Sequence, residues 1–154
     1  MAKTNLIKGI VCGLMLTAVV GTTAFAGTVS RSANLRSVKT YSDTYTGEIG
    51  AYNAYGTYNS SSKIAYANLK VQNVSGSIYK YYGEVSRWNS FLKEWTDSDI
   101  ESQILAPGGN FTVSIVRDYA YDGFDYYNHA KGYYSPYTDS VVLDSYTYEV
   151  IQTN

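Results

Sequence analysis

Hydrophobic and polar residues alternate along most of the chain from residue 45 onward, which is the pattern of half-buried β-strands. The clearest segment is KIAYANLKVQ, residues 63–72. In four segments the following residues fall on one face: Ala65, Ala67, Leu69 and Val71; Tyr79, Tyr81 and Val85; Phe111, Val113 and Ile115; and Val142, Tyr146, Tyr148 and Val150. In the second segment Lys80, Glu84 and Ser86 fall on the opposite face. In the fourth, Asp144 is expected to form a bulge. The pattern predicts antiparallel strands that each turn one face toward a core.

Two segments also satisfy a helical pattern. The large apolar residues of segment 88–95 are spaced i, i+3, i+4, i+7, which suits one face of a helix. Its β-like flanks favour instead a hairpin that turns at residues 89–90. In segment 97–105, Ser98 and Glu101 are placed as in a capping box, which predicts a short helix. The same residues also suit a strand that runs into the next turn, and the sequence does not decide between the two.

About seven short strands with frequent turns and no βαβ alternation predict an all-β fold, an antiparallel β-sandwich. The segments ANLKVQNVSGS and QILAPGGNFTVSIV, with a tyrosine-rich strand between them, resemble the bacterial immunoglobulin-like modules of secreted proteins. In those modules a strand ends in Asn near Gly, and a later Leu, Pro, Gly turn precedes an alternating strand. The resemblance covers residues 63–116 and implies an immunoglobulin-like architecture. It carries over no binding residues, because the Cys-Trp-Cys core of antibody domains is absent.

The N-terminal sequence is typical of a secretory signal peptide. Lys3 and Lys8 precede an apolar run of 13 residues, GIVCGLMLTAVVG, and Ala24 and Ala26 occupy the small positions of a cleavage site. We therefore expect a signal peptide at 1–26, a flexible N-terminal arm at 27–42 and a single β-sandwich domain at 43–154. One edge strand within the arm is left open. The product is expected to be secreted, either extracellular or loosely associated with the cell surface.

Composition limits the chemistry available to the cleaved chain. Without the two leader lysines, ten basic residues face thirteen acidic ones, a net charge of about −3 that argues against nucleic-acid binding. The only cysteine, Cys12, lies in the leader, which excludes disulfides, thiol catalysis and cysteine-ligated metals. One histidine and no fixed-spacing nucleophile motif predict a protein that is not an enzyme and needs no cofactor.

The stretch YDGFDYYNHAKGYYSPY, residues 121–137, contains six tyrosines and the only histidine. Its alternation predicts that Tyr126, Ala130, Gly132 and Tyr134 face the interior, and that a ligand-binding row faces solvent. That row consists of Tyr127, His129, Lys131 and Tyr133. Tyrosine offers rigid contact area with a polar tip, which suits sugar and protein ligands. The alternative is that these tyrosines are only good strand formers.

Asp118, Asp122 and Asp125 bracket a turn and are candidates for a calcium site, since calcium binds carboxylate and carbonyl oxygens. Aspartates in turns also serve the local backbone, and the spacing matches no EF-hand loop. The sequence thus predicts a secreted, non-enzymatic binding module whose exposed tyrosines contact a cell-envelope glycan or a surface protein. The alternative is a secreted antimicrobial or toxin-like protein, and only this alternative implies contact with a membrane.

Overall fold

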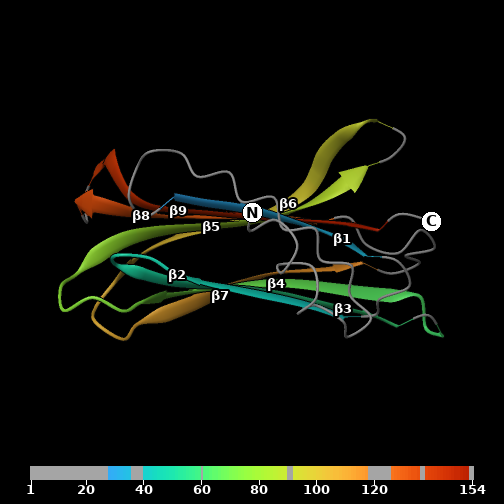
Figure 1. The fold of residues 1–154 in the computed structure, drawn as a ribbon, viewed down its shortest axis with the longest axis horizontal. Helices are drawn as coiled ribbons and strands as arrows, with labels where there is room; N and C mark the ends of the chain where they lie inside the picture. Colours follow the sequence, from blue (N-terminus) through green and yellow to red (C-terminus); the bar gives the residue numbers. More distant parts are fainter. Residues whose placement is uncertain are drawn as a thin grey trace, which may run out of the picture.

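The protein forms a β-sandwich in the computed structural model, which describes residues 28–35, 40–59, 61–89, 92–117, 126–135 and 138–152. Within these ranges there are nine strands in two stacked layers and no helix, hence none suited to crossing a membrane (Figure 1). The strands are β1 (Thr28–Leu35), β2 (Thr40–Thr46), β3 (Gly50–Asn59), β4 (Ile64–Asn73), β5 (Tyr79–Asn89), β6 (Glu94–Leu105), β7 (Asn110–Arg117), β8 (Tyr126–Ser135) and β9 (Thr138–Gln152).

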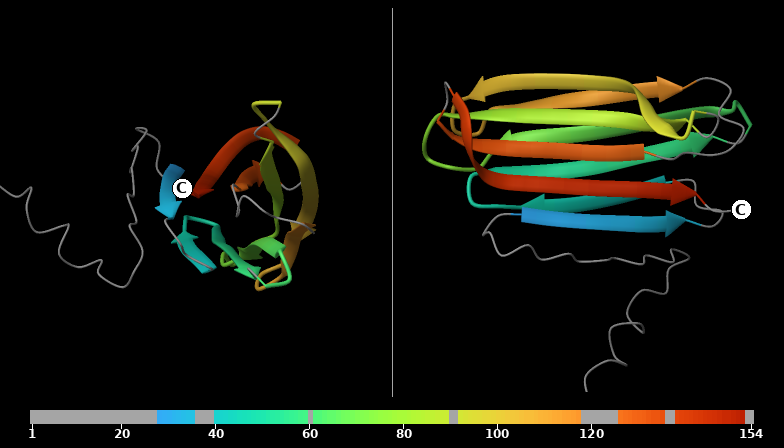
Figure 2. Two further views of the ribbon diagram at one scale, coloured as in Figure 1. Left: turned by 90° about the vertical axis from the view of Figure 1, so that its right-hand side faces the viewer. Right: turned by 90° about the horizontal axis from the view of Figure 1, so that it is seen from above.

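One sheet has the strand order β1-β9-β8-β5-β6 and the other the order β2-β3-β4-β7. All pairings are antiparallel except that of β1 with β9. The view from above in Figure 2 shows β1 beside β9 at one edge of its sheet. The predicted all-β, antiparallel sandwich is confirmed, with two strands more than the seven expected.

The alternation of the central strands sets the core as predicted. Ala65, Ala67, Leu69 and Val71 of β4 are fully buried. Tyr81 and Val85 of β5, and Phe111 and Val113 of β7, also point between the sheets. Since every second residue of a strand points to the same side, the intervening polar residues lie on the two outer faces.

Tyrosine rings fill the part of the core between β2, β3 and β9. Tyr52 and Tyr146 stack with their centroids 5.9 Å apart and their planes 9° apart, and Tyr45 stacks on both at about the same spacing, 6.1 and 6.0 Å. The hydroxyl of Tyr52 donates to Asp144 and that of Tyr146 to Asp43. Buried phenols with satisfied hydroxyls can therefore take the place of aliphatic side chains.

Segment 88–95 forms the predicted hairpin, but the predicted turn at residues 89–90 is misplaced, because Asn89 is still paired in β5, opposite Glu94 of β6. The helix considered for residues 97–105 is wrong, because these residues belong to β6. The backbone of β6 pairs with β5 along most of its length, and this ladder satisfies more backbone groups than a short capped helix would.

In β9 the prediction of a bulge is correct but its position is not. Gly132 of β8 lies opposite Asp144 while the next residue, Tyr133, lies opposite Val142, so Leu143 is the extra residue. The shift turns Val142 outward and brings Asp144 into the core, in phase with the tyrosines that follow it.

The segment 27–42, predicted as an arm, contains strand β1, and the predicted domain boundary at residue 43 falls inside β2. Strand β1 adds to the sheet edge in parallel with β9. This pairing rests on backbone hydrogen bonds, so the sequence of β1 carries little of the hydrophobic alternation by which a strand is predicted.

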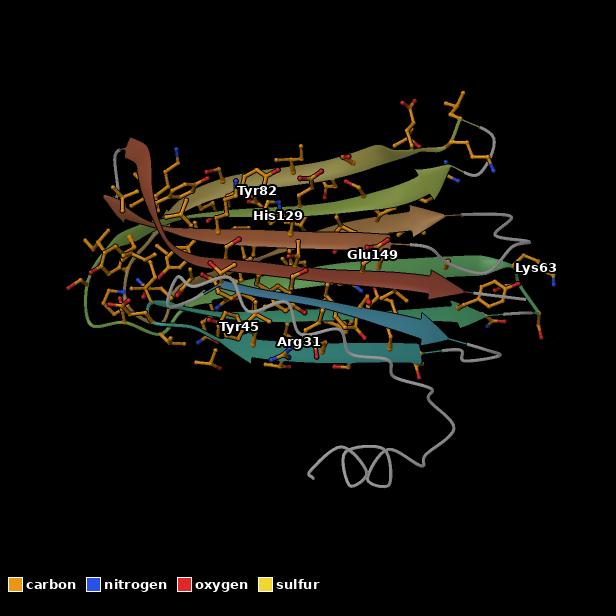
Figure 3. The ribbon with its side chains drawn as sticks, turned by 45° about the horizontal axis from the view of Figure 1, so that its top comes forward. Arg31, Tyr45, Lys63, Tyr82, His129 and Glu149 are labelled. Atoms are coloured by element: carbon orange, nitrogen blue, oxygen red, sulfur yellow. The ribbon has the colours of Figure 1, made fainter. Side chains whose placement is uncertain are left out.

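Charged side chains bridge the two sheets at both open edges. Arg31 of β1 pairs with Asp43 of β2 at 3.0 Å and also donates to the Thr44 carbonyl; Figure 3 shows Arg31 beside Tyr45 at this edge. At the other edge, Asp99 of β6 accepts a hydrogen bond from the backbone N–H of Ser114 in β7. Such side chains occupy edge groups that would otherwise be free to pair with another strand.

The two motifs that carry the immunoglobulin-like resemblance bind each other at one end of the sandwich. The fully buried Asn73, at the end of β4, exchanges backbone hydrogen bonds with Gly108 and Gly109 of the turn after β6. Its side-chain amide donates to the carbonyls of Leu105 and Ser77. The asparagine thereby ties the ends of three strands together.

Candidate functional site

The candidate site lies on the outer face, defined as the side of β5 and β8 that points away from the four-stranded sheet. Tyr81, Gly83, Val85, Ala130 and Gly132 are buried, so the residues that alternate with them lie on the outer face. The register places three pairs there: Lys80 opposite Tyr133, Tyr82 opposite Lys131, and Glu84 opposite His129. Figure 3 shows Tyr82 and His129 as neighbours on this face.

The carboxylate of Glu84 is held by hydroxyl groups. Tyr82 Oη donates to Oε2 at 2.6 Å and Ser86 Oγ donates to Oε1 at 2.7 Å. Burial by itself would raise the pKa of Glu84. The hydrogen bonds from Ser86 and Tyr82, followed by the attraction of His129 and a bond from Ser98, outweigh burial and lower this pKa below its ordinary value. Glu84 is therefore an oriented anion at neutral pH.

The imidazole of His129 contacts the ring of Tyr82 edge to face, with the centroids 5.8 Å apart and the planes at 72°. Burial lowers the pKa of His129 below its ordinary value, and the Lys131 ammonium lowers it further, while Glu84 acts in the opposite direction. The neutral imidazole is the form present at pH 7, and it offers one donor and one acceptor.

Two lysines lie near aromatic rings on the same face. Nζ of Lys131 is 6.0 Å from the centroid of the Tyr82 ring, and Nζ of Lys80 is 6.0 Å from that of Tyr133. At this distance a cation is attracted by the ring quadrupole. The face thus combines phenol rings, an imidazole, a fixed carboxylate and two ammonium groups.

Comparisons with known proteins give a likeness of fold only. No family model and no curated protein matches the chain. Among solved structures, a β-glucuronidase from glycoside hydrolase family 2 is 12% identical over 76% of this chain and 11% of its own, with a TM-score of 0.35. A β-glucosidase from Listeria innocua is 10% identical over 73% of this chain and 16% of its own, with a TM-score of 0.24. The chain spans a small part of both enzymes, and neither likeness bears on activity.

The structure brings three of the four predicted ligand-binding residues together on the predicted side of β8. His129 and Lys131 are half-buried on the outer face. Tyr133 has the predicted phase but only 7% of it is exposed, so the prediction that its ring faces open solvent is wrong. Lys80 of the paired strand lies over its ring, with Nζ 6.0 Å from the centroid. Tyr127 takes the backbone position opposite Ser86, and its side chain lies outside what the structure describes.

The predicted calcium ligands Asp118, Asp122 and Asp125 lie outside the described residues. In the part of the chain that the structure covers, no group of three His, Cys, Asp or Glu residues could hold a metal ion.

Sequence reasoning missed Tyr82 and Glu84 as site residues. Alternation had already placed Glu84 on the polar side of its strand. It could not show that β5 pairs with β8, because strand order is a property of the whole sheet. The polar residues of the segment SIYKYYGEVSR were the available signal.

Two more exposed tyrosines lie on the outer side of the other sheet. Tyr55 of β3 is 37% exposed and Tyr66 of β4 is 41% exposed. Because they are tyrosines on a sheet surface, as half-buried Tyr82 is, but lie on the opposite side of the sandwich, they are controls for the outer face.

His129 should titrate below its ordinary pKa of about 6.5. Since it is the only histidine, one imidazole NMR signal reports the titration. Lys131→Gln should raise the pKa by removing a repulsive charge, and Glu84→Gln should lower it further, whereas Lys70→Gln on the other sheet should leave it unchanged. Because the unfolded chain binds this proton more readily, stability should fall as the pH drops through the unfolded pKa. A midpoint at or above 6.5, unmoved by Lys131→Gln, would contradict this geometry.

Proposed function

We propose that the protein is a secreted, non-enzymatic binding module of immunoglobulin-like architecture, and that its outer face binds a glycan of the cell envelope. The observation that carries this proposal is the arrangement around Tyr82. Its ring contacts His129 and lies under Lys131, while its hydroxyl is bonded to Glu84. Sugar recognition needs an aromatic surface for C–H groups together with polar groups that hold hydroxyls, and this arrangement supplies both.

The polar groups of the outer face are already oriented before any ligand binds. Both oxygens of Glu84 accept hydrogen bonds, and Ser86 is bonded in turn to Ser98 of β6 at 2.7 Å. The residues also sit on paired strands, which hold their positions better than loops do. Such preorganisation reduces the entropy lost on binding.

Tyr82→Ala should weaken glycan binding about tenfold or more, as expected when an aromatic contact at the centre of a site is removed. The measurement is the affinity of the full chain for a panel of envelope polysaccharides. His129→Ala should weaken binding in the same assay, whereas Tyr55→Ala and Tyr66→Ala should not. Melting temperatures of all four variants separate lost binding from lost folding.

The proposal fails if no glycan is retained, or if the four tyrosine and histidine variants lose affinity equally. Dye release from vesicles of phosphatidylglycerol and phosphatidylcholine is the companion assay. No release is expected, and release at the concentrations that bind glycan would indicate action on membranes instead.

A further inference from the structure

An exposed isoleucine lies directly beside Glu84 on the outer face. Ile100 of β6 is opposite Glu84 in the register and is 55% exposed. Side chains that lie opposite each other in an antiparallel pair have their Cβ atoms about 5 Å apart. On the other side of Glu84, His129 of β8 extends the same row onto a third strand. A ligand group that crosses this row therefore meets an apolar side chain, a carboxylate and an imidazole in that order.

The carboxylate of Glu84 can accept a hydrogen bond from a ligand. A carboxylate offers about four acceptor positions, and as an anion it donates no hydrogen bond. Tyr82, Ser86 and Ser98 donate to it, which leaves about one position. Glu84 is only half-buried, so a ligand can reach its carboxylate from solvent. The group that binds there must supply an N–H or O–H donor next to the apolar surface of Ile100.

An acetamido group presents a donor and a methyl group in the arrangement that this row requires. Like a peptide bond, the amide of an N-acetylated sugar is planar and trans. Its N–H and its methyl group therefore lie on one side, and the carbonyl oxygen and the bond to the sugar ring lie on the other. With the N–H directed at Glu84 and the methyl group toward Ile100, the sugar ring lies toward β8 and the carbonyl oxygen stays hydrated. A sugar hydroxyl supplies the donor without the methyl group.

We propose that the outer face recognises an N-acetylated amino sugar, with Glu84 accepting its amide N–H and Ile100 contacting its acetyl methyl group. This inference rests on the proposed glycan-binding function and specifies the class of sugar. Peptidoglycan and chitin are two sources of this chemistry.

Oligosaccharides that share one β-1,4-linked backbone test the contribution of the acetamido group alone. At carbon 2 a cello-oligosaccharide carries a hydroxyl group, a chitosan oligosaccharide an ammonium group and a chitin oligosaccharide an acetamido group. The three are titrated, at equal chain length, against the full chain in a calorimeter. The chitin oligosaccharide should bind at least about tenfold more tightly than the cello-oligosaccharide, as expected for one hydrogen bond to a charged acceptor and one buried methyl group.

Ile100→Ser should weaken the binding of the chitin oligosaccharide about fourfold, the effect of one lost methyl contact, and should leave the cello-oligosaccharide unaffected. Ile104→Ser is the matched control. Ile104 lies on the same strand and face and is 49% exposed, but it is opposite Lys80 instead of Glu84. Glu84→Gln should also reduce the preference for the chitin oligosaccharide, whereas Glu149→Gln, which removes a half-buried carboxylate of β9, should not.

The possible results separate this inference from the proposed function. A preference for the chitin oligosaccharide that falls in Ile100→Ser and Glu84→Gln, but not in the two controls, supports the acetamido contact. A preference that Ile100→Ser leaves unchanged overturns it. Equal binding of the cello-oligosaccharide, dependent on Tyr82, overturns it and leaves the glycan-binding function intact. Tighter binding of the chitosan oligosaccharide overturns it as well, because Glu84 would then pair with an ammonium group.

Binding of none of the three oligosaccharides overturns the acetamido contact, and the wider panel of polysaccharides then decides the glycan-binding function. Where the preference holds, retention of the protein on purified peptidoglycan and on chitin identifies which of the two sources supplies the sugar.

Discussion

Asp144→Asn should lower the free energy of unfolding by about 3 kcal/mol, roughly 10 °C in melting temperature for a domain of this size. Asp144 is fully buried and accepts hydrogen bonds from three successive backbone N–H groups, those of Glu48, Ile49 and Gly50, at 2.8–2.9 Å. The hydroxyl of Tyr52 donates to the same carboxylate at 3.3 Å.

These bonds tie β9 of one sheet to the turn between β2 and β3 of the other. A buried carboxylate is tolerated only where donors surround it, and successive N–H groups in a turn provide such a site. Asparagine would direct its NH₂ group at donors and leave at least one buried N–H without an acceptor. The loss should therefore exceed the value of a single neutral hydrogen bond.

Glu48→Gln is the matched control for Asp144→Asn, because it removes a carboxylate from the same turn where the side chain is exposed. It should change stability by less than about 0.5 kcal/mol. Urea denaturation of both variants decides the matter. Equal stability of Asp144→Asn and the unmodified protein would show that the carboxylate does not hold the two sheets together.

Tyr52→Ala should destabilise the protein by about 4 kcal/mol, the cost of removing a large buried ring. Tyr52 is fully buried and its ring stacks on those of both Tyr45 and Tyr146. Burial, followed by the charge of Asp144, raises the pKa of Tyr52 well above its ordinary value, so the phenol stays protonated and remains a donor.

The space around Tyr52 is fitted to its ring. A Cβ added at Gly132 of β8 would lie 2.8 Å from the Tyr52 hydroxyl, closer than such atoms normally approach. Removal of the ring would therefore leave a cavity that the facing strand cannot easily fill, which adds to the lost transfer free energy.

Tyr55→Ala tests the same residue type on the same strand but on the opposite face. Its ring is partly exposed, and its loss should cost less than about 1 kcal/mol. Denaturation midpoints of the two variants should therefore differ widely. Similar midpoints would contradict the assignment of alternate tyrosines to the core and to the surface.

Side-chain alternation predicted the parts of the fold in which one face of a strand is buried. Leu69, Val113 and Val85 were placed in the core from their spacing alone. Alternation gave wrong or no predictions where a backbone feature, such as a bulge or an edge pairing, determines which way the side chains point. The extra residue Leu143 in β9 turned Val142 outward and Asp144 inward, and the parallel pairing of β1 has no marked hydrophobic pattern.

The site was predicted on one strand and is shared by two. His129 and Lys131 were identified because their own strand separates them from Ala130 and Gly132. The contacts of Lys80, Tyr82 and Glu84 with this row come from β5, whose place beside β8 depends on the whole sheet order. No local pattern specifies such a neighbour across about 45 residues of sequence, because strand pairing is non-local.

Chemical-shift mapping of the ¹⁵N-labelled protein with the glycan retained in the binding panel tests the central claim most directly. We expect the amide signals of β5 and β8 around Tyr82, His129 and Lys131 to shift with a single dissociation constant, while those around Tyr55 and Tyr66 stay in place. Shifts centred on the four-stranded sheet, or spread evenly over both sheets, would contradict the claim that the outer face binds the ligand.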